Sequence, residues 1–268
     1  MMKKVLLFMG SILLFSQMFS LTGCMTSVTG CTEKSGNFTY KIELTTEELL
    51  SIGLSKEGQQ QETIVLPYMV EGRVVSRIGK TVRYSFGKGR SWKGYFKSEK
   101  LKNIYFPKGF SKSKLDDGFF DGIPNLKSIY WADIDACQDE LANLCSITYV
   151  SYANYLKNSI QAGNGGKIDF SRFKVANVSY YMNNGTDDIY FIDYVSGTKI
   201  INKPLSPTWG DYYFTGWYKD KELTTLFDFE NDIIPVIEKD ERGNDIIEEV
   251  KLYAGWSKIE VEKPPHRI

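Results

Sequence analysis

The sequence predicts a mainly β protein in which a short solenoid of repeats is followed by a small β module. Aromatic residues make up 14% of the chain, including 17 tyrosines and 16 phenylalanines, and aromatic side chains favour strands over helices. A phrase of the form Leu-x-x-Ile-aromatic recurs in the first half, and alternating aromatics bounded by glycine fill the last third. The length is sufficient for two modest hydrophobic cores.

The N-terminal segment predicts export. Lys3 and Lys4 precede an apolar run over residues 5–16, which is shorter than the roughly 20 apolar residues that a membrane-spanning helix needs. A charged start, a short apolar run and small residues after it are typical of a secretory signal, which is removed from the mature protein. We therefore expect residues 1–23 to be a signal peptide.

The end of this segment predicts a lipid anchor. Leu21-Thr22-Gly23-Cys24 resembles the lipobox of bacterial lipoproteins. The resemblance implies that Cys24 becomes the first mature residue and is acylated, and two or more acyl chains attach a protein stably to a cell membrane or outer membrane. Residues 24–36 are small and polar and are expected to form a flexible tether outside the cytoplasm. The alternative is an ordinary signal peptide with a cysteine nearby.

Reactive residues are too sparse to predict an enzyme. The only histidine, His266, lies in a tail at 259–268 that is expected to be disordered, where it cannot supply a catalytic triad or a two-histidine metal site. The acidic residues between Asp116 and Glu140 fall where turns are expected, so solvated turns are favoured over catalysis or calcium binding. We predict no catalytic residue, no metal and no cofactor.

Net charge and cysteine content bear on which partners the protein binds and whether it contains a disulfide. Without residues 1–23 the chain has 31 basic and 33 acidic residues, a balance that argues against a dedicated nucleic-acid binder. Cys137 and Cys145 are eight residues apart and could form a disulfide outside the cytoplasm. The alternative, two small buried apolar side chains, stays open.

The first folded unit is expected over residues 37–160. Alternating apolar residues predict a strand over 38–44, and Thr45-Thr46-Glu47-Glu48 predicts a capping box that begins a short helix over Leu49 to Ile52. The repeated phrases then centre on Ile64, Ile104, Ile129 and Ile147. Repeats that each contain one short strand predict a solenoid, and the longest gap, from Ile64 to Ile104, predicts one turn plus an inserted loop.

These phrases resemble a known repeat family. Leu66-Pro67 followed by the run from Gly72 to Gly79, and Gly118-Phe119-Phe120-Asp121-Gly122 followed by the run from Asn125 to Ile129, resemble the BspA-like leucine-rich repeats of bacterial surface proteins. The resemblance covers roughly residues 60–160 and implies a leucine-rich-repeat-like solenoid.

The repeated phrases end before a linker expected over residues 161–174, where Gly163 to Gly166 predict a hinge. A different set of motifs begins after this linker. Asn183-Asn184-Gly185 predicts a hairpin turn. Three further motifs follow it: Tyr-Tyr-Phe-Thr-Gly-Trp-Tyr at 212–218, Leu-Thr-Thr-Leu-Phe-Asp-Phe at 223–229, and Leu-Tyr-Ala-Gly-Trp at 252–256.

The order of these motifs closely resembles the Listeria–Bacteroides repeat, also called the internalin B-type repeat, over residues 175–258. The resemblance implies a small β-grasp-like module that serves as a spacer or contact unit and has no catalytic residues. Two departures from the family are Asp211, in place of a glycine, and a long acidic stretch over 231–249. We expect the acidic stretch to extend a hairpin.

A basic segment with interleaved aromatic residues predicts a surface that binds an anionic ligand. Ten basic residues and one acidic residue, Glu99, lie between Arg73 and Lys102, with aromatics interleaved. Such a mixture could bind an anionic glycan, an envelope polymer or a host protein by charge and stacking. The predicted contact residues are Arg83, Lys88, Arg90, Trp92, Lys93 and Tyr95. The alternatives are that this segment is simply solvated, or that it attracts the acidic stretch of the second unit.

Together these features predict a lipid-anchored cell-surface protein that mediates adhesion or partner binding and catalyses nothing. The alternative is a structural spacer or assembly component of the cell envelope without a specific ligand. The sequence predicts no particular oligomeric state.

Overall fold

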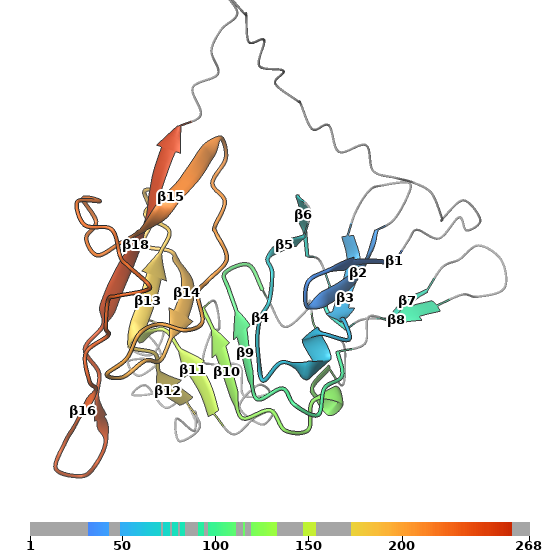
Figure 1. The fold of residues 1–268 in the computed structure, drawn as a ribbon, viewed down its shortest axis with the longest axis horizontal. Coiled ribbons are helices and arrows are strands. Elements are labelled where there is room, and N and C mark those ends of the chain that lie inside the picture. The colour runs from blue at the N-terminus through green and yellow to red at the C-terminus, as the bar shows by residue number, and fades with distance from the viewer. Residues whose placement is uncertain are drawn as a thin grey trace, which may run out of the picture.

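The fold, taken from a computed structural model, is described for residues 32–42, 49–70, 72–75, 77–79, 81–83, 91–93, 96–110, 115, 119–132, 147–153 and 173–258. Strands make up nearly all of the regular structure in these residues, so the predicted mainly β class is confirmed. Short 3-10 turns at η1 (Gly58–Gln60) and η3 (Phe119–Gly122) interrupt the strands. Figure 1 shows the arrangement.

The described chain begins with a three-stranded antiparallel sheet in the order β1-β2-β3. Its strands are β1 (Thr32–Ser35), β2 (Phe38–Ile42) and β3 (Leu49–Leu54). The tether expected over 24–36 is therefore wrong at its C-terminal end, because residues 32–35 pair with β2.

The helix expected over Leu49 to Ile52 is also wrong, because this segment is β3. Ile52 lies opposite Tyr40, and Leu54 lies opposite Phe38. All four side chains are buried, and a period of two in the buried positions suits a strand. Cross-strand packing therefore overrides the local capping signal, as tertiary contacts commonly override weak helix propensity.

A five-stranded parallel sheet follows, in the order β12-β11-β10-β9-β4. Its strands are β4 (Thr63–Val65), β9 (Asn103–Phe106), β10 (Ser128–Trp131), β11 (Ile147–Val150) and β12 (Phe173–Val175). They lie side by side in chain order (Figure 1), and every pair is parallel.

The register of this sheet explains the repeated phrases. Ile64, Ile104 and Ile129 lie in one row across β4, β9 and β10. The fourth phrase is offset by one residue, because Ile147 pairs with Ser128 and it is Thr148 that pairs with Ile129. This offset aligns Tyr149 with Tyr130, which the phrase alignment did not predict.

The long gap between β4 and β9 contains two small hairpins. The first joins β5 (Met69–Val70) to β6 (Arg73–Val74), and the second joins β7 (Thr81–Arg83) to β8 (Ser91–Lys93). Between them, Ile78 forms parallel bridges to both Ile52 and Leu115. The gap thus holds an added strand-like position as well as an insertion.

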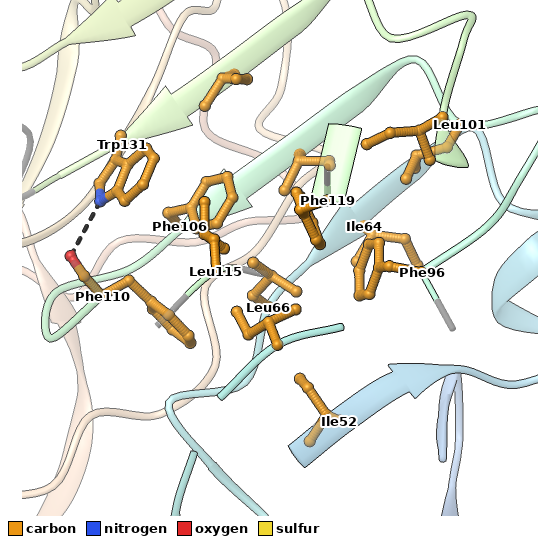
Figure 2. Close-up of a cluster of buried hydrophobic side chains, with 14 of the residues drawn as sticks. Ile52, Ile64, Leu66, Phe96, Leu101, Phe106, Phe110, Leu115, Phe119 and Trp131 are labelled. Atoms are coloured by element: carbon orange, nitrogen blue, oxygen red, sulfur yellow. Dashed lines mark hydrogen bonds between the residues drawn. The ribbon is translucent and has the colours of Figure 1, made fainter. Parts of the chain in front are cut away.

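One face of the parallel sheet buries the first hydrophobic core. Figure 2 shows Ile64, Leu66, Leu101, Phe106, Phe119 and Trp131 gathered there. The rings of Phe106 and Trp131 stack with centroids 4.2 Å apart, and the Trp131 indole N–H donates to the Phe110 carbonyl at 3.1 Å. Each fully buried side chain of this size contributes roughly 1.5–3 kcal/mol.

The C-terminal sheet has four strands in the order β14-β13-β18-β15. They are β13 (Val178–Tyr181), β14 (Ile189–Asp193), β15 (Tyr212–Tyr218) and β18 (Val250–Lys258). β13 and β18 are parallel, and the other neighbours are antiparallel.

Two features of this part of the chain were predicted. Asn183-Asn184-Gly185 lies in the turn between β13 and β14, where Asn183 and Gly185 have positive φ values of 48° and 87°, which asparagine and glycine adopt more readily than other residues. The acidic stretch contains the hairpin of β16 (Glu238–Lys239) and β17 (Asp245–Ile246).

Candidate functional site

A row of tyrosines lies on the second face of the parallel sheet. Tyr105, Tyr130 and Tyr149 occupy neighbouring positions on β9, β10 and β11. Consecutive rings are stacked, with centroids 4.1 Å and 4.4 Å apart and planes 8° and 1° from parallel. Because successive residues of a strand point to opposite faces, this row lies opposite the core that contains Phe106 and Trp131.

The tyrosine row packs against the C-terminal sheet. The Tyr105 ring stacks on Phe191 of β14 at 5.2 Å, and the Tyr149 ring contacts Tyr194 at 5.1 Å. One buried cluster contains all three tyrosines together with residues of β13, β14, β15 and β18. The two sheets therefore share a core.

This shared core connects the two units that the sequence predicts. The expected linker at 161–174 lies mostly outside the described residues, but its end, from Phe173, belongs to β12 of the parallel sheet. The units expected at 37–160 and 175–258 are packed together through the tyrosine row rather than separated by an open hinge.

A buried carboxyl group lies at the centre of this junction. Asp193 ends β14 and is 1% exposed. Its Oδ1 accepts hydrogen bonds from the Tyr105 hydroxyl and from the Tyr194 backbone N–H, each at 2.8 Å. The Asn202 side-chain amide donates in turn to the Tyr105 hydroxyl at 2.8 Å. These bonds tie β9, β14 and the loop after β14 together.

The polar groups of the junction are only partly satisfied. Three buried polar groups have no hydrogen-bond partner: Asp193 Oδ2, the Tyr180 hydroxyl and the Ser179 hydroxyl. No described lysine or arginine forms an ion pair with Asp193. Burial raises the pKa of Asp193 to about 6, although the hydrogen bonds from Tyr105 and Tyr194 oppose this rise. Burial, followed by the nearby Asp193 charge, raises the pKa of Tyr105 well above its ordinary value. Such groups can set a pH dependence of stability.

The predicted ligand surface falls partly within the described residues. Arg83, Trp92 and Lys93 belong to the β7–β8 hairpin, where Val82 pairs with Trp92 and Arg83 pairs with Ser91. The backbone thus brings these three positions close together. Lys88, Arg90 and Tyr95 lie outside the described residues, as do Cys24, Cys137 and Cys145.

The basic and acidic hairpins lie at opposite ends of the molecule. In Figure 1 the β7–β8 hairpin extends at the right, beyond the N-terminal sheet, whereas β16 lies at the lower left. The predicted alternative in which the two segments attract each other does not fit this arrangement. Lys239 on β16 pairs locally with Asp245 on β17, at 2.8 Å.

Within the described residues, no group of three histidine, cysteine, aspartate or glutamate side chains is placed to hold a metal ion. No helix in the same part of the chain is long and apolar enough to cross a membrane.

The C-terminal sheet and its motifs can be compared with known families. Residues 177–238 match the Listeria-Bacteroides repeat domain. The sequence resemblance is thereby confirmed for this segment, which runs from β13 through β15 to the start of β16. The repeat domain suggests a surface or adhesion-type module. β18 lies beyond the matched residues but completes the sheet between β13 and β15. No curated protein matches the chain.

Sequence reasoning missed the junction. Its signal was only partial, because Tyr105 and Tyr130 directly follow the repeated isoleucine whereas Tyr149 stands two residues after Ile147. The one-residue offset of β11 that completes the row is visible only in the structure. Asp193 gave no such signal, since burial of a carboxyl group cannot be read from the sequence around it.

Asp193→Asn should change how stability depends on pH. A folded-state pKa near 6 against an ordinary value of 3.8 means that the carboxyl group favours folding below about pH 4, and that this contribution is lost as the pH rises through about 6. Asparagine does not titrate. The free energy of unfolding of the variant minus that of the wild type should therefore increase by about 2.4 kcal/mol from pH 4 to pH 7.5.

Urea unfolding at a series of pH values measures this difference. Asp187→Asn, which changes a carboxyl group with 94% side-chain exposure, is the matched control and should give no comparable increase. A difference between Asp193→Asn and wild type that stays constant or decreases as the pH rises contradicts the prediction.

Proposed function

We propose that this protein is a lipid-anchored cell-surface protein that mediates adhesion or partner binding and is not an enzyme. The observation that carries the proposal is the Listeria-Bacteroides repeat domain at 177–238, which is consistent with a surface module. The lipobox-like sequence that ends at Cys24 supports the anchor, since two or more acyl chains suffice for stable attachment.

The finer fold assignment belongs to the same proposal. Five parallel strands that neighbour one another in chain order support a leucine-rich-repeat-like solenoid. The mixed order β14-β13-β18-β15 supports a β-grasp-like module. Since the two units share a core, the protein would hold its binding surface at a fixed orientation above the tether.

The preferred contact surface is the basic hairpin of β7 and β8. In Figure 1 the backbone of β7 and β8 lies apart from the acidic hairpin, which supports attraction of an anionic glycan, an envelope polymer or an acidic patch of a host protein to the basic hairpin. The second candidate function is a structural spacer without a specific ligand, and the shared core favours it equally because a stiff body also suits a spacer.

Replacing Cys24 tests the anchor. Cys24→Ala removes the sulfur that would carry the diacylglyceryl group, so the protein should move from the membrane fraction to the soluble fraction of the producing cells. Fractionation followed by immunoblotting measures the shift. Cys31→Ala changes a nearby cysteine and should leave the protein in the membrane fraction. If Cys24→Ala stays in the membrane fraction, the lipid-anchor proposal is contradicted.

Charge reversal tests the contact surface. A fourfold variant carries glutamate in place of Arg83, Lys88, Arg90 and Lys93. We expect its binding to sulfated and carboxylated glycans to weaken at least about tenfold and to lose most of its salt dependence, because the attraction is between opposite charges. A glycan array with the detergent-solubilised full chain, read at two salt concentrations, measures both effects.

A matched control reverses four exposed lysines elsewhere. These are Lys56, Lys127, Lys174 and Lys258. The control should keep most of the binding. Equal binding by wild type and the hairpin variant would contradict the proposed surface, and a full chain that self-associates but binds no glycan or host protein would favour the spacer.

A further inference from the structure

A pocket of about 260 Å³ opens where the two units meet. Tyr68 and Lys108 come from the segments that follow β4 and β9. Asn184 and Tyr190 come from the β13–β14 hairpin, and Leu205 and Ser206 come from the loop before β15. Ligand sites occur preferentially between domains, so this location favours a binding site.

The walls of the pocket are held in place across the junction. The Lys108 backbone N–H donates to the Tyr190 carbonyl at 2.7 Å, and the Lys108 ammonium group forms an ion pair with Asp188 of the β13–β14 turn. This ion pair lowers the pKa of Asp188. Both contacts join one unit to the other, so the pocket exists without a ligand.

Gly109 shapes one wall of this pocket. Its φ of +94° is unfavourable for other residues, and a Cβ atom there would lie 2.3 Å from Cε2 of the Tyr68 ring. The absent side chain lets the Tyr68 ring lie against the loop backbone. An aromatic face thus becomes part of the pocket lining.

Unused hydrogen-bonding groups converge on this aromatic and apolar lining. Asn184 uses its amide oxygen to accept from Thr186, while its NH₂ group has no partner among the described residues. The Tyr190 hydroxyl, on a side chain that is 6% exposed, also has none within that part of the chain, and neither does the Ser206 hydroxyl. The groups available to a ligand are therefore one amide donor and two hydroxyls.

The residues that line the pocket are almost all uncharged. Lys108 is the single charged residue among those that line the pocket, and its ammonium is paired with Asp188. A phosphate or carboxylate ligand would have to share that ammonium with Asp188 and approach the Asp188 carboxylate, which repels it. An uncharged molecule with several hydroxyl groups and one apolar face fits better, because it can pack on Tyr68 and Leu205 while it binds the free amide and hydroxyl groups.

From these features we propose that the pocket binds one uncharged sugar residue of a glycan. The inference deepens the proposed function, on which it rests, by adding a ligand class and a site separate from the basic hairpin. In this arrangement the hairpin takes anionic partners by charge, and the pocket takes a neutral sugar by shape and hydrogen bonding.

Filling the pocket tests the proposal. Leu205 is 48% exposed, so Leu205→Trp can occlude the pocket without disturbing either core. Glucose, galactose, N-acetylglucosamine and, as an anionic comparison, glucuronate are titrated separately into the detergent-solubilised full chain, with binding read by saturation-transfer NMR. At least one neutral sugar should bind wild type, and Leu205→Trp should weaken that binding at least about tenfold.

Ile201→Trp is the matched control, since Ile201 is an apolar residue of the same loop with 80% exposure and does not line the pocket. It should bind the sugar as wild type does, and so should the charge-reversed hairpin variant. Ser206→Trp is a second occluding variant in case Leu205→Trp folds poorly.

Two outcomes would overturn the pocket proposal: no binding of any neutral sugar, whether or not glucuronate binds, or equal binding by wild type and both occluding variants. Failure here with intact hairpin-dependent binding of anionic glycans would leave the proposed function standing. If binding of anionic glycans does not depend on the hairpin but a neutral sugar still binds in the pocket, the hairpin surface is contradicted and the pocket proposal stands.

Discussion

The stacked row of Tyr105, Tyr130 and Tyr149 is the interaction on which the architecture depends. Its ring spacings of 4.1 and 4.4 Å require three parallel strands in one register. The same register places Ile104 beside Ile129 on the opposite face. The row therefore fixes the parallel sheet and also supplies the apolar surface on which β14 packs. Aromatic pairs of this kind contribute about 0.5–1.5 kcal/mol beyond the area that they bury.

The junction built on this row combines tight packing with an electrostatic cost. Asp193 ties the Tyr105 hydroxyl to the end of β14, yet its second oxygen is buried without a partner. A buried carboxyl group of this kind is expensive when charged. The junction also joins the two units whose segments form the walls of the pocket, while the basic hairpin of β7 and β8 lies at the far side of the first unit (Figure 1). Both candidate contact surfaces thus sit on one stiff body.

Sequence periodicity predicted the parts of the fold that repeat or alternate. The row of Ile64, Ile104 and Ile129 and the turn at Asn183 were visible because they follow from local spacing. The strand at Leu49–Leu54 was mistaken for a helix because the capping signal at Thr45 is local, whereas its pairing with β2 is set by cross-strand packing. The pocket could not be predicted, since its residues come from segments joined only by packing between the two units. Asp193 was missed for the same reason.

The claim that the two sheets form one cooperative body is tested most directly by differential scanning calorimetry of the detergent-solubilised full chain. The shared core predicts one heat-absorption peak with a calorimetric enthalpy equal to the van't Hoff enthalpy, because neither sheet can lose its packing without exposing the tyrosine row. Two separated peaks, or a calorimetric enthalpy well above the van't Hoff value, would contradict the claim.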